Sequence, residues 1–312
     1  MRGAAVVEMG TLETEMGTRG ASAGCGVGAA AEPSLWDKGA VETELRELFS
    51  YAWPVVLTMV MFYLANVVTM AFVGQLGSAD LAAAGLASMF CNVTGVSIAV
   101  GLSSGLETQA SQLFGAAQLR KVGVATQRAL VVICAAMVPV ALLWLFTAPL
   151  LRAAGIEADV AALASNFVYV MILGLPAIAL QETVRKYLQC QGIMQPFVYV
   201  ATACNIVHVL ACLVFISPNS AAAWGVSGAA LTLVITYYLN NALIISYCLW
   251  SGAHKPTWGG WTWESLEHVP AFLRLAVPGA GMICLEWWCF ELMTLLSASL
   301  GTRVVAAQTV ML

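Results

Sequence analysis

Two glutamates, Glu286 and Glu291, lie within an apolar stretch from Val277 to Leu300 that is long enough to cross a membrane as a helix. Neither has a basic residue nearby in the sequence. An ionised carboxylate at the centre of a bilayer costs roughly 2.5 kcal/mol or more on insertion scales, so an acid at such a depth is by default a functional-site hypothesis. We therefore predict that this pair carries the chemistry of the protein.

Five residues along a helix turn it by ~140° and raise it by ~7.5 Å, so Glu286 and Glu291 do not share one narrow stripe. We expect their side chains to face different neighbouring helices across a cavity. Desolvation favours the neutral, protonated acid, whereas a cationic ligand favours the charged form. One carboxylate then holds a proton or a cation but seldom both, which is what exchange of one for the other requires.

Four residues are candidates for lining such a cavity. Trp287 and Trp288 flank Glu286 and offer faces for cation–π contact, worth roughly 0.5–2 kcal/mol each, although both residues equally suit packing against neighbouring helices. Asn66 and Asn92 lie in earlier apolar stretches. A buried amide in lipid must be hydrogen-bonded, so each Asn suits a contact between helices as well as a place in the cavity.

Glu107 follows two small residues, Gly101 and Gly105, whose spacing favours close approach of another helix. We expect Glu107 to lie toward the cytoplasmic end of its helix, in a gating or structural ion pair. Direct proton carriage is the alternative. The basic residues expected to be available for that pair are Arg120, Lys121 and Arg128.

The composition indicates a membrane protein, because 60% of residues are hydrophobic and 10% are charged, against about 25% charged in soluble domains. Several stretches reach the ~20 apolar residues that a spanning helix needs. The predicted spans are 51–73, 84–112, 127–149, 161–184, 196–217, 225–250 and 275–299, and an eighth begins at Val304. This spacing predicts an all-α, polytopic transmembrane helical bundle rather than a β-barrel of short alternating strands.

Eleven of the thirteen Lys and Arg residues fall in segments on one side of these spans, and only Arg152 and Arg303 fall on the other. By the positive-inside rule, the amino terminus is cytoplasmic. Residues 1–47 are rich in Gly, Ala and Glu, which predicts a disordered cytosolic tail. They lack the continuous apolar core of a signal peptide.

The sequence also contains a faint internal repeat. A shift of 224 residues aligns six identical residues, and it places Pro54 at the opening of the first span and Pro278 at the opening of the seventh. A six-span unit returns the chain to its starting side, so the copies have parallel topology, as in two-lobe transporters. We therefore predict a six-helix amino-terminal lobe (48–250), a cytoplasmic connector rich in Trp (251–274) and the start of an incomplete second lobe (275–312).

Several function classes are disfavoured. The nine cysteines and three histidines have no metal-ligand spacing, and His208 suits a hydrogen-bonded structural role better than proton relay. The chain has no phosphate loop, no Gly-x-Ser-x-Gly and no His-Glu-x-x-His. We therefore expect no enzyme activity, no metal or other cofactor and no nucleic-acid partner.

Several motifs resemble the multidrug and toxic compound extrusion (MATE) family, in its eukaryotic branch, from about Glu44 to the end of the chain. Two are specific, namely the segment Arg185-Lys-Tyr-Leu-Gln-Cys-Gln-Gly-Ile-Met-Gln-Pro196 and the segment Glu286-Trp-Trp-Cys-Phe-Glu291. The weaker ones are Pro54, Val73-Gly-Gln-Leu-Gly77, Asn92-Val-Thr-Gly95 and Gly115-Ala116 through Gln127-Arg128.

This resemblance implies a twelve-span, two-lobe antiporter that exports organic cations, xenobiotics or plant-type secondary metabolites in exchange for protons. Glu286 and Glu291 match the positions of the acids that bind the cation and the proton in this family. Gln308 matches the start of the next helix and is a further candidate for the substrate lining. Because most of the second lobe is absent, we expect a chain truncated after the start of the eighth helix.

Three points stay open. The function alternatives are a lipid-linked substrate flippase, which a large cationic lining would favour, and a non-transporting or regulatory membrane fragment. The coupling ion is a proton, with sodium as the alternative. The expected partners are a small cationic or amphipathic substrate and the lipid bilayer, in either the plasma membrane or the vacuolar membrane.

Overall fold

The computed structural model describes residues 38–218 and 223–299, with the side chains of residues 38, 40, 51, 291, 292 and 294–299 outside the description. The chain divides into two compact units, Met1–Leu48 and Phe49–Leu312. One long helix, α2 (Lys38–Val73), runs across the boundary, and every later element belongs to the second unit. Within the described ranges every regular element is a helix, which confirms the predicted all-α class.

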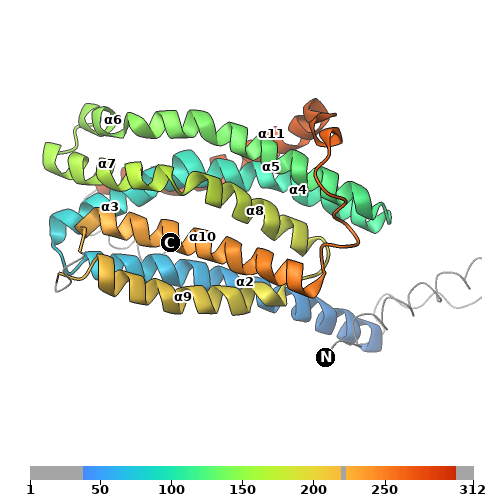
Figure 1. Ribbon diagram of the computed structural model, residues 1–312. Helices are drawn as coiled ribbons and strands as arrows, with labels where there is room; N and C mark the ends of the chain where they lie inside the picture. The colour runs from blue at the N-terminus through green and yellow to red at the C-terminus, as the bar shows by residue number, and fades with distance from the viewer. Residues whose placement is uncertain (1–37, 219–222, 300–312) are drawn as a thin grey trace, which may run out of the picture. The chain divides into compact units, whose positions relative to one another are not determined.

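After α2, the described elements in chain order are α3 (Ser78–Cys91), the π-helical turn η1 (Asn92–Val96), α4 (Ser97–Gly115), α5 (Leu119–Leu145), α6 (Thr147–Ala153), α7 (Ala158–Ile172), α8 (Leu175–Gln189), α9 (Gln195–Phe215), α10 (Gly225–Ser251), the 3₁₀ turn η2 (Trp263–Leu266) and α11 (Val269–Ser299) (Figure 1). Six of the described helical segments are long and apolar enough to cross a membrane, and the bent pair α7–α8 makes up to seven. Each of the seven predicted spans overlaps one of them, and the predicted eighth, from Val304, lies outside the described residues.

The second span contains a feature that the sequence did not predict. Between α3 and α4 the helix widens into the π-helical turn η1 without breaking the span. A π-turn shifts the hydrogen-bond register by one residue and thereby loosens nearby carbonyl groups, and such turns are frequent at functional sites. The Val93 carbonyl in this turn accepts a hydrogen bond from a distant side chain, that of Trp288.

The predicted fourth span, 161–184, is not one straight helix. It bends by 55° between α7 and α8, at Leu173 and Gly174. Pro176 in the first turn of α8 has no N–H to donate, and it disfavours helical geometry in the residue before it. Gly174 also lies close to Val234 of α10, where an added Cβ would approach Val234 Cγ2 to 3.2 Å.

Helix ends differ from the predicted spans in two further places. The predicted third span ran to 149, but α5 ends at Leu145 and a separate short helix, α6, follows Phe146. The predicted disordered tail ran to 47, but α2 begins at Lys38. The spacing of Glu42 and Arg46 by four residues, with the acid first, favours a helix there.

The two repeat prolines lie inside their helices and do not open them. Pro54 is well inside α2, and Pro278 is nine residues into α11. In long apolar helices, local adjustment and neighbouring groups satisfy the carbonyl that a proline leaves free. The Thr58 hydroxyl makes a separate bond in the same turn, because it donates to the carbonyl of Pro54 itself at 2.7 Å.

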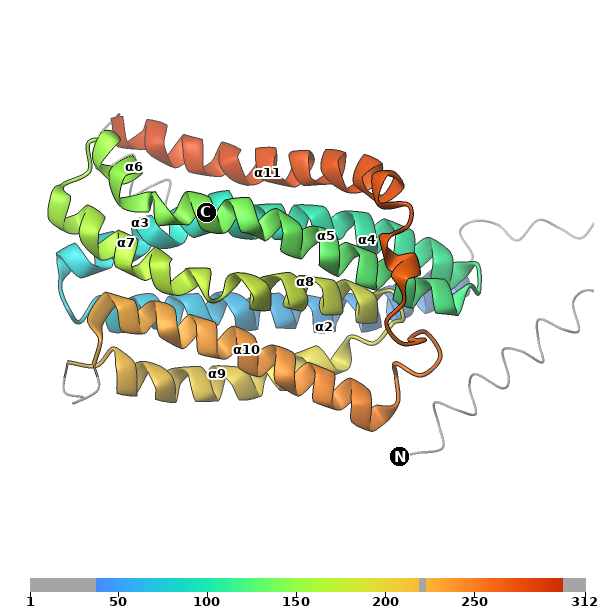
Figure 2. The ribbon, with the colours of Figure 1, turned by 45° about the horizontal axis from the view of Figure 1, so that its top comes forward.

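Within the second unit, α8 contacts α5, α4 and α10, while α11 packs along α4 and α9 packs along α10 (Figure 2). His208 of α9 is fully buried and joins three helices. Its Nε2 lies 3.0 Å from the Ala65 carbonyl and 2.9 Å from Thr69 Oγ1, and its Nδ1 lies 2.8 Å from Thr236 Oγ1. The hydrogen-bonded structural role expected for this histidine is confirmed.

The segment between α10 and α11 is shorter than the predicted 251–274, because α11 already begins at Val269. We call residues 252–268 the connector. Two side chains of α5 hold it: the Gln127 amide donates to the Gly260 carbonyl at 2.7 Å and accepts from the Thr262 N–H at 3.1 Å. Arg128 donates through Nε to the Glu267 carbonyl at 2.8 Å. The connector is therefore fixed to the end of the bundle.

Candidate functional site

The helix α11, which carries the predicted acids, packs on α4 through small residues. A Cβ added to Gly101 or Gly105 would lie 2.6 Å from the Cα of Ala280 or 2.7 Å from the Cβ of Ala276, respectively. Close helix approach at these two glycines, expected from their spacing, is confirmed. Further along the seam, Cys284 Sγ donates to Ser97 Oγ at 3.6 Å.

Glu286 lies on the opposite side of α11 from this seam. Buried Ala276 and Cys284, with partly buried Ala280 between them, mark the packed stripe, and two residues beyond Cys284 the helix has turned by about 200°. Glu286 is accordingly exposed, and it has no ion-pair partner in the described part of the chain. The side chain of Glu291 lies outside the described residues, so the predicted pairing of these two acids around one cavity stays a prediction.

The two tryptophans beside Glu286 differ in their contacts. Trp288 is 40% exposed, and its indole N–H donates to the Val93 carbonyl in η1 at 2.9 Å. A second tryptophan, Trp144 of α5, donates to Thr94 Oγ1 in the same turn at 2.8 Å. The π-turn is therefore held by two indoles, one from α11 and one from α5. Trp287 is half-buried, and its predicted place in the substrate lining stays a prediction.

The other candidate lining residues do not form a described cavity together. Asn66 is exposed, and its amide donates at 3.2 Å to the Phe62 carbonyl of its own helix, which is not the contact between helices that a buried amide would need. Asn92 is exposed at the start of η1. Gln308 lies outside the described residues.

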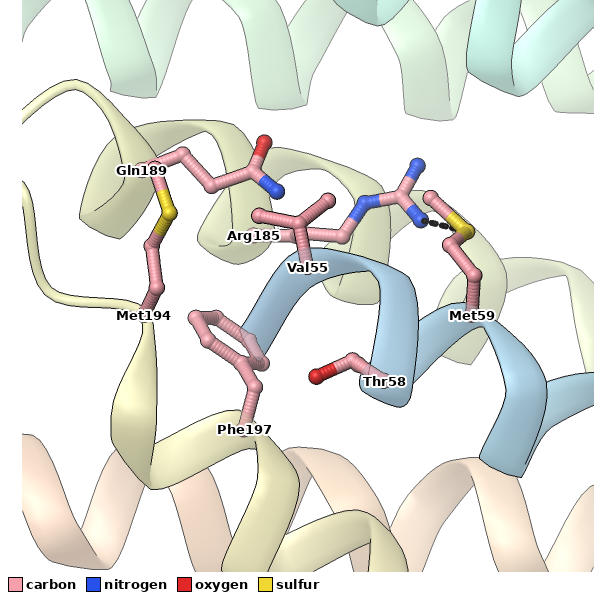
Figure 3. Close-up of a pocket in the computed structure, with 7 residues that line it drawn as sticks. All are labelled: Val55, Thr58, Met59, Arg185, Gln189, Met194 and Phe197. Carbon is pink, nitrogen blue, oxygen red and sulfur yellow. Dashed lines mark hydrogen bonds between the residues drawn. The ribbon is translucent and has the colours of Figure 1, made fainter. Parts of the chain in front are cut away.

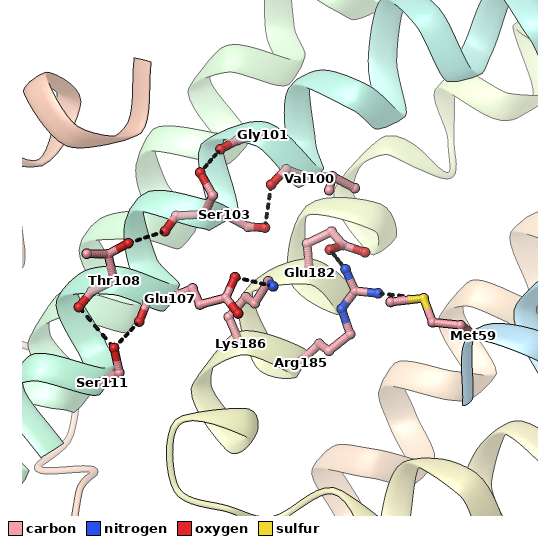
Figure 4. A network of polar contacts seen from close by, with 11 residues as sticks. Met59, Val100, Gly101, Ser103, Glu107, Thr108, Ser111, Glu182, Arg185 and Lys186 are labelled. Carbon is pink, nitrogen blue, oxygen red and sulfur yellow. Dashed lines mark hydrogen bonds and ion pairs between the residues drawn. The ribbon is translucent and has the colours of Figure 1, made fainter. Parts of the chain in front are cut away.

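Glu107 makes an ion pair, but with a partner that the sequence did not indicate. Its Oε2 accepts from Lys186 Nζ of α8, and none of the three predicted partners Arg120, Lys121 and Arg128 takes part (Figure 4). The Glu107 side chain is 55% exposed and that of Lys186 is 15% exposed. The bond joins α4 to α8, because these two helices pack against each other.

A second ion pair, Glu182 with Arg185, was not predicted from the sequence. Both side chains are buried, with 8% and 9% exposure, and they are three residues apart on one face of α8. The sequence did contain a signal for this pair, because an acid and a base three residues apart lie at the edge of the predicted fourth span. The guanidinium also points toward Met59 of α2, with 4.0 Å between Nη1 and Sδ (Figure 4).

A small cavity lies beside Arg185, between α2, α8 and the start of α9 (Figure 3). Its lining residues are Val55, Thr58, Met59, Arg185, Gln189, Met194 and Phe197. Its volume is about 10 Å³, which is room for about one water molecule beside the buried Arg185 Nε, an atom with no hydrogen-bond partner in the described chain. The cavity is too small for an organic substrate.

The charged side chains in the described part of the chain are therefore of two kinds, paired and without an ion-pair partner. The charges on α4 and α8 neutralise one another, whereas Glu286 on α11 has no such partner. No group of three or more His, Cys, Asp or Glu side chains in the described ranges has the arrangement of a metal site. The chemistry that this arrangement offers is reversible binding of a cation or a proton at Glu286.

Comparison with known proteins decides the family. The MatE family model matches residues 54–214, which is more than half of the chain. The chain belongs to the MATE family. It is 38% identical over 271 residues to Multidrug and toxin extrusion protein 1 of Homo sapiens, covering 87% of this chain and 47% of the relative. It is 35% identical over 280 residues to Protein DETOXIFICATION 16 of Arabidopsis thaliana, covering 90% and 57%.

Solved MATE structures agree with the fold. The crystal structure of the eukaryotic MATE transporter AtDTX14 superposes with a TM-score of 0.77 at 30% identity, covering 82% of this chain and 56% of that one. A transporter of the broader MOP superfamily from Pyrococcus furiosus superposes with a TM-score of 0.67 at 20% identity, which concerns the fold alone. The chain spans about half the length of the curated relatives it matches. Its family and its apolar helices make it an integral, multi-pass membrane protein.

Proposed function

We propose that this MATE chain takes part in secondary antiport, in which organic cations, xenobiotics or secondary metabolites leave the cytosol in exchange for protons. The observation that carries the proposal is Glu286, which is exposed on the face of α11 that turns away from α4 and has no ion-pair partner among the residues that the structure describes. A carboxylate without a fixed counter-charge is free to take a proton or an organic cation in turn. Glu291 is proposed as the second acid of the same exchange.

Alternating occupancy of Glu286 would bias the protein between two conformations. A ligand shifts such an equilibrium only by its difference in affinity for the two states. The protonated and the cation-bound acid differ in charge and size, so they favour different arrangements of α11 against its neighbours. The energy for export then comes from the proton gradient.

The test is uptake of a fluorescent organic cation into proteoliposomes that contain the chain, driven by an acid interior. We expect Glu286→Gln to reduce proton-driven uptake at least tenfold, because glutamine neither releases a proton nor balances a cation. Glu157→Gln is the matched control, since Glu157 is an exposed acid just before α7 and far along the chain from α11. Equal flux in the original chain and the Glu286→Gln variant would remove this acid from the mechanism.

A second arm tests the coupling ion. The proton gradient is collapsed with an ionophore while an inward or outward sodium gradient is kept. Proton coupling predicts that uptake stops in both sodium conditions. Uptake that persists and follows the sodium gradient would replace the proton by sodium in the proposal.

We also infer that the connector end of the bundle faces the cytoplasm. Six basic residues gather where the start of α5, the end of α8 and the connector meet. They are Arg120, Lys121, Arg128, Arg185, Lys186 and Lys255. An excess of Lys and Arg beside membrane spans is typical of the cytoplasmic side. A protease site inserted after Gly260 should be cut by a protease in the cytoplasm and be protected from one added outside intact cells. Cleavage from outside would show that the connector end faces the opposite side.

A further inference from the structure

A groove runs along α8 on the face of the bundle that the antiport proposal does not use. The helix α8 lies between α5 and α10 and contacts both (Figure 2). The cavity there has a volume of about 290 Å³. Its lining residues are Thr126, Gln127, Leu130, Leu180, Thr183, Val184, Tyr187, Ile245, Cys248, Leu249, His254, Trp258 and Trp261.

The floor of the groove is a regular helical stripe. Leu180, Thr183, Val184 and Tyr187 recur at spacings of three, four and seven residues, so they lie on one face of α8. Leu130 of α5 and residues of α10 supply the walls. The long axis of the groove therefore follows the helix axis, from the connector toward the interior of the span.

The connector closes one end of the groove with aromatic residues held in place. Tyr187 Oη lies 2.6 Å from Thr257 Oγ1, and the Tyr187 ring meets the edge of Trp258 at 6.3 Å between ring centroids. Trp258 in turn meets Trp261 at 5.4 Å, with the rings perpendicular. Because α5 also holds the connector through Gln127, this end is preorganised.

Several polar side chains in the lining already have partners within the protein. The hydroxyls of Thr126 and Thr183 donate to carbonyls one turn back, and His254 Nδ1 lies 2.9 Å from the Cys248 carbonyl. The lining contains no acid. An organic cation would thus find no counter-charge in the groove, whereas a hydrocarbon chain would find an apolar surface with little desolvation cost.

Basic side chains surround the closed end. The Arg120 guanidinium lies against Gly259, where an added Cβ would be 2.9 Å from Nη1, and Lys255 lies in the connector beside His254. Both are exposed. Two exposed acids, Glu264 and Glu267, are also in the connector, and their backbone carbonyls accept hydrogen bonds from Arg128. These two carboxylates are fewer than the basic residues at this end, which are Arg120, Lys121, Arg128 and Lys255. An excess of positive charge therefore remains at this end.

We propose that the groove binds one acyl chain of an anionic phospholipid, with the phosphate headgroup at Arg120 and Lys255. With a volume of about 290 Å³, against about 10 Å³ for the one-water cavity beside Arg185, the groove has room for part of an acyl chain. The tryptophans at the connector end suit the depth of the headgroups, where indole rings gather. The bound lipid fastens the connector, and with it the start of α11, to the amino-terminal helices.

The test is native mass spectrometry of the protein released from mixed micelles of phosphatidylglycerol and phosphatidylcholine. We expect one phosphatidylglycerol per protein to be retained, with at least a fivefold preference over phosphatidylcholine. The double variant Arg120→Gln/Lys255→Gln loses the preference, and Leu130→Trp, which fills the groove, loses retention of both lipids. Arg152→Gln and Trp263→Phe are matched controls, because Arg152 and Trp263 are exposed and lie outside the lining.

Two results would overturn the proposal: equal retention of the two lipids by the original chain, or an unchanged preference in the double variant. The double variant changes exposed residues only, so it keeps the test decisive if Leu130→Trp does not fold. The readout is lipid retention, so it stands apart from the transport assay and fails or succeeds independently of it.

Discussion

Charged residues of α4, α8 and α11 all lie in or beside apolar stretches of the sequence. In the described part of the structure, those of α4 and α8 are paired with opposite charges, and Glu286 on α11 is not. On α8, Glu182 and Arg185 are buried together, and Lys186 reaches across to Glu107 on α4. On α11, Glu286 faces away from the packed seam and lacks an ion-pair partner among the described residues.

An acid within a membrane segment is therefore not informative until its partners are known. A buried pair is weak evidence for net stability, but removing one partner leaves an uncompensated charge and is costly. An exposed, unpaired acid contributes little to folding and is free to bind ligands. The effect of each substitution on unfolding therefore distinguishes a structural charge from a functional one.

The largest effect is expected when the buried pair is broken. Glu182→Met leaves Arg185 buried without its acid, which costs about 3–5 kcal/mol. Thermal unfolding in detergent, followed by tryptophan fluorescence, measures the loss. The double variant Glu182→Met/Arg185→Met removes both charges and should recover most of the stability. If the single variant unfolds like the original chain, the pair is not a structural element.

An intermediate effect is expected at the contact between α11 and η1. Trp288→Phe keeps an aromatic ring but removes the N–H that binds the Val93 carbonyl, so a loss of about 0.5–1.5 kcal/mol is expected. The same unfolding assay applies, with Trp250→Phe as the control because Trp250 is 80% exposed. Equal melting of the two variants would show that the indole bond adds nothing to the packing of α11 on α4.

The smallest effects are expected at the two exposed acids. Glu107→Gln weakens a half-exposed pair and should cost at most about 1 kcal/mol, and high salt should reduce the difference because it screens such pairs. Glu286→Gln should leave unfolding unchanged while it lowers transport. A clear destabilisation by Glu286→Gln would show that this acid, like those on α4 and α8, has a structural role.

Most of the fold was predictable from the sequence because apolar length alone locates membrane helices. The placement of Gly101 and Gly105 at a helix seam and the structural role of His208 were predictable too. The π-turn at 92–96 and the bend at Gly174 were not. The π-turn is held by residues distant in sequence, the indoles of Trp144 and Trp288. The bend had a local signal in Gly174 and Pro176, but the continuous apolar stretch favoured a single straight span.

The site was predictable only as far as residue types allow. The apolar surroundings of Glu286 singled it out, but its direction follows from which stripe of α11 meets α4, and small residues such as Ala276 carry little signal for that. The predicted partners of Glu107 were wrong for a related reason. Arg120, Lys121 and Arg128 are nearer in sequence, yet the packing of α8 on α4 brings Lys186 to it.

The seam between α4 and α11 also has a practical consequence for following motion. An added Cβ at Gly101 or Gly105 would collide with α11, whereas at Gly281, on the outer side of α11, it would meet nothing within 4 Å. Met282, beside it, is 71% exposed. A spectroscopic probe attached at 281 or 282 should therefore report movements of α11 during turnover without disturbing the surface on which it rests.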